Sequence, residues 1–161
     1  MNKLLTAATL ALVLALPTQA ADRITREQIQ QVIRDADAAA VERDAAAIGV
    51  YLSHSFEKIV EFEHKEWMTK VRINKDEYLA MIDAGWAGIG DYNYQRDNIK
   101  IHLMPNGQGG LSYSTITEHM FLDGMEMTSR IREFATYGLE NSRLVITEVS
   151  SHPLLGDTTP Q

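Results

Sequence analysis

The chain has 161 residues, of which 45% are hydrophobic, and it contains no cysteine. The absence of cysteine excludes disulfide bonds, iron–sulfur clusters and cysteine-ligated zinc, and the length favours a single domain. With 15 basic against 22 acidic residues the net charge is −7, and without a basic stripe neither nucleic acid nor an anionic membrane is an expected partner.

The first twenty residues have the three-part plan of a secretory signal peptide. Lys3 precedes an apolar run over residues 4–16, and Pro17 precedes a site of small residues that ends at Ala20. The run is shorter than the ~20 residues that a membrane-spanning helix needs. We therefore expect cleavage after Ala20 and a periplasmic or secreted protein without a membrane span. Removal of Lys3 leaves 14 basic against 22 acidic residues, a net charge of −8.

The first predicted helix begins at Arg26. Thr25 and Gln28 have the spacing of a capping box, and Ile24 and Ile29 have the spacing of a hydrophobic staple. Apolar residues then recur at helical intervals, with polar residues between them. One face of this helix is therefore predicted to be buried.

Two further helices are indicated by their N-terminal caps. Asp44 is placed to cap a short helix over residues 45–52. Asn74 and Glu77 have the capping-box spacing at the start of a third helix, which we expect Gly85 to end.

Alternation of apolar and polar residues predicts a hairpin and then a long antiparallel meander. The predicted strands cover residues 56–64 and 67–73 in the hairpin and 92–104, 110–122, 125–137 and 143–151 in the meander. Helices, hairpin and meander together predict one α+β domain over residues 21–161, with its core at about residues 24–152. In this layout a curved antiparallel sheet folds over the helices.

The turn at Asp123-Gly124 predicts which residues of the meander share a face. If the turn is symmetric, Leu122 stands opposite Met125. Each step back along the first strand is then matched by one step forward along the second. The more apolar face should be concave and packed on the helices. Its candidate pocket residues are Ile116, Glu118, Met120, Met127, Ser129, Ile131 and Glu133.

The turn at Asn106-Gly107 extends this face by the same reasoning. It places Ile99, Ile101 and Leu103 opposite Ser114, Ser112 and Gly110 respectively. The other face alternates threonine with arginine and carries the aromatic pair Tyr113/Phe134, which suits a sheet-to-sheet dimer contact as well as it suits water.

Two carboxylates, Glu118 and Glu133, lie on the apolar face of this predicted register. A glutamate buried without a partner costs several kcal/mol or takes up a proton. Either these residues line a wet cavity, or the register differs by one residue, in which case both point outward into solvent.

Several short segments and the closing meander occur in an order that is typical of one known superfamily. The first helix ends in Val41-Glu42-Arg43-Asp44-Ala45-Ala46-Ala47, the stretch Tyr51-Leu52-Ser53-His54-Ser55-Phe56 follows, and Asn74-Lys75-Asp76-Glu77-Tyr78-Leu79 begins a later helix. With the meander, this succession resembles the nuclear transport factor 2-like superfamily, which includes ketosteroid isomerases and SnoaL-type polyketide cyclases. The resemblance covers Ile24–His152.

The resemblance implies a cone-shaped α+β roll, also called cystatin-like, whose bent sheet wraps the long helix and leaves a mostly apolar pocket. It also implies a homodimer formed through the outer face of the sheet. Aligned on Asp44, the isomerase pattern places a tyrosine at the position of Ala36 and a general-base aspartate at the position of Val60. Without that donor and that base, isomerase activity of this type is not expected.

Three functions remain open from the sequence. The first is a non-catalytic module that binds a small apolar or amphipathic molecule, oriented by Glu118, Ser129 and Glu133. The second is a SnoaL-like or isomerase-like enzyme with Glu118 or Glu133 as general base. The third is a protein-interaction or immunity-type factor whose acidic surface faces a basic partner.

No metal or cofactor is expected. The five histidines lack the spacing that places two metal ligands on one helix face. No glycine-rich loop precedes a helix in the manner of a phosphate-binding site.

Overall fold

A computed structural model describes residues 23–64, 67–122 and 124–154. The expected signal peptide and its cleavage after Ala20 lie outside these residues. The described elements are α1 (Arg26–Val41), α2 (Ala45–Tyr51), β1 (Leu52–His64), β2 (Trp67–Asn74), α3 (Lys75–Ala87), β3 (Tyr92–Leu103), β4 (Gly109–Leu122), β5 (Met125–Glu140) and β6 (Arg143–Pro153). No helix in these ranges is long and apolar enough to cross a membrane.

The three helix starts are confirmed by their caps. The Thr25 hydroxyl accepts a hydrogen bond from the Gln28 backbone at 3.2 Å, and the Gln28 side chain accepts one from the Thr25 backbone at 2.8 Å. Asn74 and Glu77 form the same reciprocal capping box at α3, and the Asp44 side chain caps α2 by accepting a hydrogen bond from the Ala47 backbone. The prediction that Gly85 ends the third helix is wrong, because its backbone stays helical and α3 continues to Ala87.

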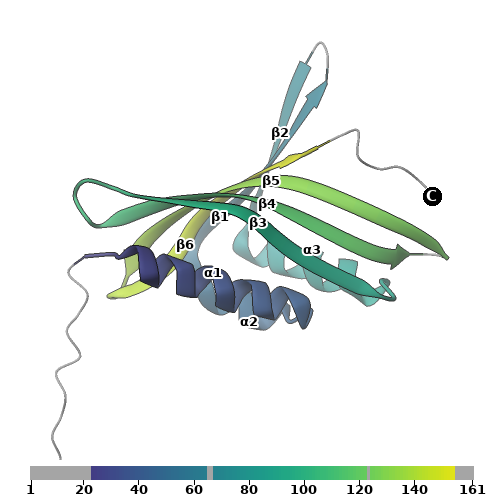
Figure 1. Cartoon of the computed structure of the whole chain (residues 1–161), viewed down its shortest axis with the longest axis horizontal. Helices are drawn as coiled ribbons and strands as arrows, with labels where there is room; N and C mark the ends of the chain where they lie inside the picture. Colours follow the sequence, from purple (N-terminus) through teal and green to yellow (C-terminus); the bar gives the residue numbers. More distant parts are fainter. Residues whose placement is uncertain (1–22, 65–66, 123, 155–161) are drawn as a thin grey trace, which may run out of the picture.

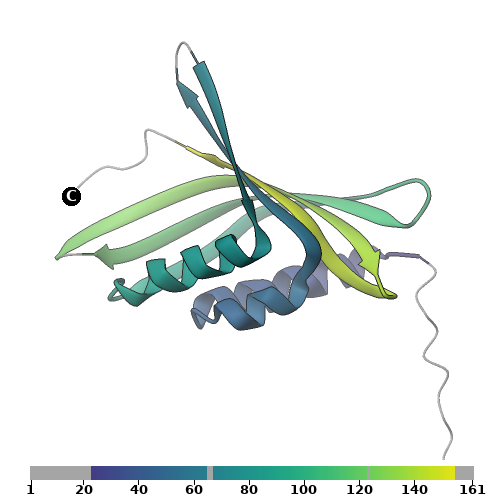
Figure 2. The ribbon, with the colours of Figure 1, turned by 180° about the vertical axis from the view of Figure 1, so that it is seen from behind.

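The six strands form one sheet in the order β2-β1-β6-β5-β4-β3. Every neighbouring pair is antiparallel except β1 and β6, which are parallel. The sheet curves, and the helices lie against its concave side (Figures 1 and 2). The β1–β2 hairpin extends away from the body of the sheet (Figure 1). This is the α+β roll that the resemblance implied, and the parallel β1–β6 pair makes the sheet mixed where an antiparallel sheet was expected.

The hydrophobic core fills the space between the helices and the sheet. Ile29, Val32 and Ile33 project from the buried face of α1, which confirms the helical periodicity there. They pack with Leu52 and Phe56 of β1 and with residues of β3, β5 and β6. The strand β1 begins at Leu52, before the predicted start at Phe56, because α2 runs directly into it.

The register predicted from the Asp123-Gly124 turn is confirmed along the whole β4–β5 pair. Leu122 pairs with Met125, Glu118 with Ser129, and Ile116 with Ile131. Because side chains alternate strictly across a strand, this register settles which face each residue of both strands belongs to.

The register predicted from the Asn106-Gly107 turn is confirmed only near the turn. Leu103 pairs with Gly110 and Ile101 with Ser112. A β-bulge then lies between Asp97 and Lys100, at the point where Asn98 adopts a φ of 56°. The predicted pairing of Ile99 with Ser114 is therefore wrong.

The bulge also changes which residues of β3 face the helices. Beyond it Arg96 pairs with Ile116, Tyr94 with Glu118, and Tyr92 with Met120. Direct partners in an antiparallel pair share a face. Arg96, Tyr94 and Tyr92 are thereby turned toward the concave side, where an uninterrupted register would have placed their neighbours.

Candidate functional site

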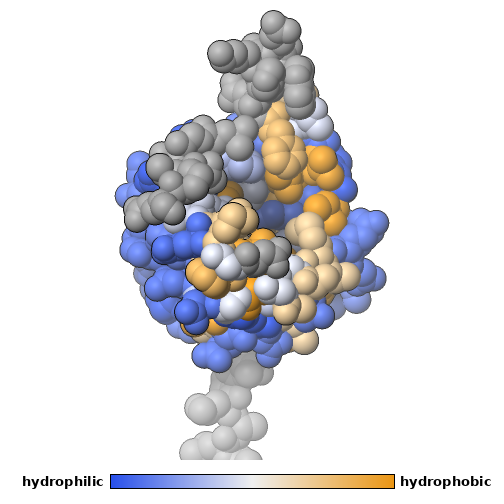
Figure 3. All heavy atoms as spheres, turned by 90° about the vertical axis from the view of Figure 1, so that its right-hand side faces the viewer, coloured by the Kyte–Doolittle hydropathy of each residue, from blue (hydrophilic) through white to orange (hydrophobic). Residues whose placement is uncertain are grey.

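A cavity of about 360 Å³, here called the main cavity, lies between the concave face of the sheet and the helices. Most of its wall is aliphatic or aromatic. Figure 3 looks onto the end of the molecule where α3 ends and β3 begins, and hydrophobic residues surround a hollow there. Residues that form the apolar wall include Ile48, Phe56, Ile82, Trp86, Ile116, Met120 and Ile131.

Five of the seven candidate pocket residues line the main cavity. They are Ile116, Glu118, Met120, Ile131 and Glu133. Ser129 and Met127 share their face of the sheet, directly opposite Glu118 and Met120, but neither lines the cavity, and Met127 is exposed. Of the two alternatives for the glutamates, the structure therefore has both carboxylates on the cavity side.

Glu133 is held between two cations. The Arg96 Nη1 donates to Glu133 Oε1 at 2.8 Å, and the Lys58 Nζ donates to Oε2 at 3.2 Å. All three side chains are only 11–12% exposed. Burial by itself raises the pKa of Glu133, but the charges of Arg96 and Lys58 outweigh it and lower the pKa to about 2. Glu133 is thus ionised at neutral pH and is a poor general base.

Arg96 joins the sheet to helix α1. Its Nε donates to the two carboxylate oxygens of Asp37 at 2.8 and 3.2 Å. Further N–H groups reach the Ser114 hydroxyl at 2.6 Å and the Tyr94 hydroxyl at 2.8 Å. The Tyr94 hydroxyl donates in turn to Asp37 at 2.8 Å. The guanidinium is therefore satisfied on several sides, as a buried charge requires.

The pKa values of this cluster follow from the same contacts. Burial disfavours the charged form of Arg96, but Glu133, Tyr94 and Asp37 raise the pKa of Arg96 well above its usual value. Burial raises the pKa of the Tyr94 phenol well above its usual value. Arg96 therefore stays protonated and the Tyr94 phenol stays neutral over the physiological pH range.

Glu118 lies in a different environment on the same face of the sheet. The Tyr92 hydroxyl donates to Glu118 Oε1 at 2.7 Å. Burial, and then this carboxylate, raise the pKa of Tyr92. The indole of Trp86 packs edge-on against Tyr92, with 6.4 Å between ring centroids. Glu118 has this phenol as its hydrogen-bond donor and forms no ion pair among the described residues.

Lys58 and Ser151 complete the polar part of the wall. The Lys58 ammonium lies 5.5 Å from the centroid of the Tyr78 ring, in addition to its ion pair with Glu133. Ser151 is 4% exposed, and its hydroxyl has no hydrogen-bond partner. Nothing in the sequence showed that Lys58 would meet Glu133, because 75 residues separate the two in the chain.

The two positions that the resemblance aligned with isomerase residues both reach the main cavity. Ala36 of α1 and Val60 of β1 contribute to its wall. Their hydrocarbon side chains supply neither a hydrogen-bond donor nor a base there.

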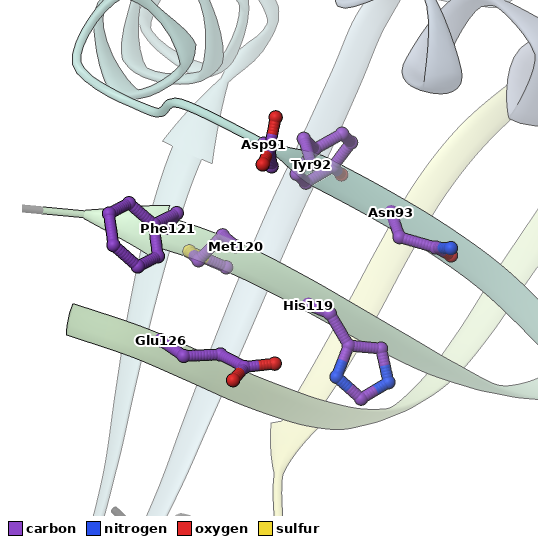
Figure 4. A pocket seen from close by; sticks show the side chains of 7 residues that line it. All are labelled: Asp91, Tyr92, Asn93, His119, Met120, Phe121 and Glu126. Atoms are coloured by element: carbon purple, nitrogen blue, oxygen red, sulfur yellow. The ribbon is translucent and has the colours of Figure 1, made fainter. Parts of the chain in front are cut away.

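A second hollow of about 330 Å³ lies at the ends of β3, β4 and β5. Figure 4 shows Asn93, His119 and Glu126 on these three neighbouring strands. The His119 ring is 2.9 Å from the Thr128 hydroxyl. No group of three histidine, aspartate or glutamate side chains within the described ranges is placed to hold a metal ion.

No protein-family model and no curated protein matches the sequence. Solved structures do match. A scytalone dehydratase-like protein from Novosphingobium aromaticivorans has a TM-score of 0.66 at 9% identity, covering 84% of this chain and 86% of the other. The hexachlorocyclohexane dehydrochlorinase LinA-type3 from Novosphingobium barchaimii has a TM-score of 0.67 at 12% identity, covering 84% and 89%.

A third match decides the fold. An NTF2-like protein with a cystatin-like fold from Novosphingobium aromaticivorans has a TM-score of 0.62 at 15% identity, covering 82% of this chain and 83% of the other. The chain has the nuclear transport factor 2-like fold. The resemblance stated from the sequence is confirmed at this level. Because this fold carries both enzymes and binding proteins, function has to be argued from the cavity.

Proposed function

We propose that the protein binds a small amphipathic molecule in the main cavity without transforming it. The observation that carries this proposal is an apolar cavity whose most buried carboxylate, Glu133, has both oxygens engaged by cations. A small-molecule site typically combines a largely apolar wall with a few fixed polar groups. A carboxylate with a pKa of about 2 fixes geometry but does not remove protons at neutral pH.

The cavity volume limits the size of the ligand. A water molecule occupies ~30 Å³ in the liquid, so about 360 Å³ has room for about a dozen non-hydrogen atoms. A single ring system or a medium-length chain with one polar group fits that volume.

Filling the cavity tests the proposal. Ala36→Phe places a ring in the cavity, whereas Ala38→Phe places the same ring on the exposed side of the same helix. Ligand binding is measured by isothermal titration calorimetry with 2-nonanone as the probe. We expect binding by the wild type and by Ala38→Phe, and loss of binding in Ala36→Phe. Equal binding by all three proteins would place the ligand elsewhere and refute the proposal.

Catalysis by Glu118 is the second candidate. Its support is the position of the Glu118 carboxylate at the cavity beside the Tyr92 phenol, an arrangement that offers a base and a proton donor. Two structurally similar proteins carry the names of a dehydratase and a dehydrochlorinase. The test is deuterium exchange at the carbons next to the 2-nonanone carbonyl, followed by NMR. Exchange that depends on Glu118, and is lost in Glu118→Gln, would establish the enzyme and overturn the non-catalytic proposal.

Location and assembly complete the proposal. The signal-like sequence up to Ala20 supports a periplasmic or secreted protein, which mass spectrometry of the N-terminus after expression of the full chain would test.

The outer face of the sheet supports a homodimer, because Tyr113 and the exposed Phe134 pack there with 4.9 Å between ring centroids. Light scattering of Phe134→Glu against wild type tests the dimer. The third function, interaction with a basic protein, stays a prediction from net charge.

A further inference from the structure

Ser151 is the one residue of the cavity wall, among those described, that buries a hydroxyl without a hydrogen-bond partner. It lies on β6 and is 4% exposed. An unsatisfied buried hydroxyl typically costs ~1–3 kcal/mol, so native proteins rarely keep one without a use. The second such hydroxyl in the described chain, that of Ser53, lies outside the cavity wall.

The strand register places Ser151 beside the buried ion pairs. Ser151 stands directly opposite Glu133 on β5 and beside Val60 on β1. Lys58 reaches the same point from β1, since its Nζ binds Glu133 Oε2. Directly opposed residues have Cβ atoms about 5 Å apart. Ser151, Glu133 and Lys58 therefore converge on one part of the wall.

The hydrogen-bonding capacity left over in this part of the wall is mainly donor capacity. Both oxygens of Glu133 already accept hydrogen bonds from cations. The Lys58 ammonium has three N–H donors, of which one serves Glu133. The Ser151 hydroxyl and the remaining Lys58 donors can therefore bind a single oxygen that has two lone pairs. A carbonyl oxygen has that property.

Charge decides between an ionic and a neutral ligand. The cations Lys58 and Arg96 balance the anions Asp37 and Glu133. The same wall contains a further acid, Glu118, so a ligand carboxylate would meet like charge in a partly desolvated site. A ligand ammonium group has no lone pair with which to accept hydrogen bonds from Ser151 and Lys58. We propose that the main cavity selects an uncharged molecule with a carbonyl group, whose oxygen accepts hydrogen bonds from Ser151 Oγ and Lys58 Nζ. This inference rests on the proposed function and names its ligand class.

Four probes of nearly equal length test the selectivity: 2-nonanone, octanoate, nonylamine and nonane. Each is titrated calorimetrically into the wild-type protein at neutral pH. We expect 2-nonanone to bind more tightly than the other three. Tightest binding of octanoate or nonylamine would overturn the inference while leaving a cavity ligand in place, and absence of binding by all four probes would overturn the proposed function as well.

Two matched serine variants test the site. Ser151→Ala should weaken 2-nonanone binding about two- to tenfold, the range expected for one hydrogen bond, and leave nonane binding unchanged. Ser53→Ala removes an equally unpartnered hydroxyl, 2% exposed, that does not line the cavity, and should leave both affinities unchanged. Both variants remove an unsatisfied group, so both should fold. Unchanged 2-nonanone affinity in Ser151→Ala would overturn the inference.

Discussion

Glu118 and Glu133 face the same cavity from neighbouring strands, yet their side chains have different partners. Glu133 is locked between Arg96 and Lys58, and Glu118 accepts a hydrogen bond from the neutral Tyr92 phenol. Burial of a carboxylate is therefore not by itself a sign of catalysis. The partners decide whether a buried acid builds the structure or stays available for chemistry.

Arg96→Met should cause the largest loss of stability, because Arg96 forms the buried ion pairs that distinguish Glu133 from Glu118. The variant leaves Glu133 with one cation and removes the ionic partner of Asp37. Breaking a buried ion pair on one side costs about 3–5 kcal/mol. Urea denaturation of Arg96→Met against wild type measures this loss.

The matched control for Arg96→Met is Arg72→Met. Arg72 pairs with Glu57, but both side chains are about half exposed. Such a pair contributes about 1 kcal/mol or less. Equal losses in the two variants would contradict the structural role given to the cluster around Arg96.

Glu133→Gln should have the next largest effect, and its effect on the free energy of unfolding should depend on pH. The pKa of Glu133 falls from 4.5 to about 2 on folding, which corresponds to roughly 3 kcal/mol of stability. Because the folded pKa is the lower one, this stability is fully present above pH 4.5 and disappears as the pH falls toward 2. The free energies of unfolding of wild type and Glu133→Gln, measured from pH 6 to pH 2, should therefore converge by about that amount. A constant difference would show that Glu133 is not held ionised.

Substitution of Asn98 should have an intermediate effect on stability. The bulge at this residue turns Arg96 toward Glu133. Asn98→Val forces a β-branched residue into a φ of 56° and should destabilise the protein by about 1–2 kcal/mol. Asn98→Gly, which adopts this φ freely, should stay within about 1 kcal/mol of wild type. Thermal unfolding compares the two variants, and similar melting temperatures would argue against a strained backbone at this position.

Glu118→Gln should have the smallest effect. The amide oxygen of glutamine still accepts the hydrogen bond from Tyr92, and no ion pair is broken among the described contacts of Glu118. We expect a loss of at most about 1 kcal/mol in urea denaturation. A loss as large as that of Arg96→Met would mean that Glu118 is as structural as Glu133.

The fold was predictable wherever local chemistry decides the structure. Capping residues such as Thr25 and Asn74 set the helix starts, and the Asp123-Gly124 turn set the β4–β5 register. These signals involve residues close together in the chain. They predicted a register with Glu118 and Glu133 on the apolar face, and the structure excludes the one-residue slip that the sequence had left open.

The polar cluster was not predictable, because one backbone irregularity controls it. Alternation along β3 without a bulge turns Arg96 outward and leaves Glu133 without its strongest partner. The positive φ at Asn98 reverses the alternation. Asparagine tolerates that conformation, but an asparagine in a predicted strand is not enough to predict a bulge. Lys58 and Glu133 are also 75 residues apart in the chain, beyond the reach of any local pattern.

A crystal structure of the protein with 2-nonanone bound would test the account most directly. We predict the ketone oxygen within hydrogen-bond distance of Ser151 Oγ and Lys58 Nζ, and the alkyl chain against the apolar wall of the main cavity. A ketone oxygen turned toward Glu118, or a ligand in the second hollow beside His119 and Glu126, would contradict it.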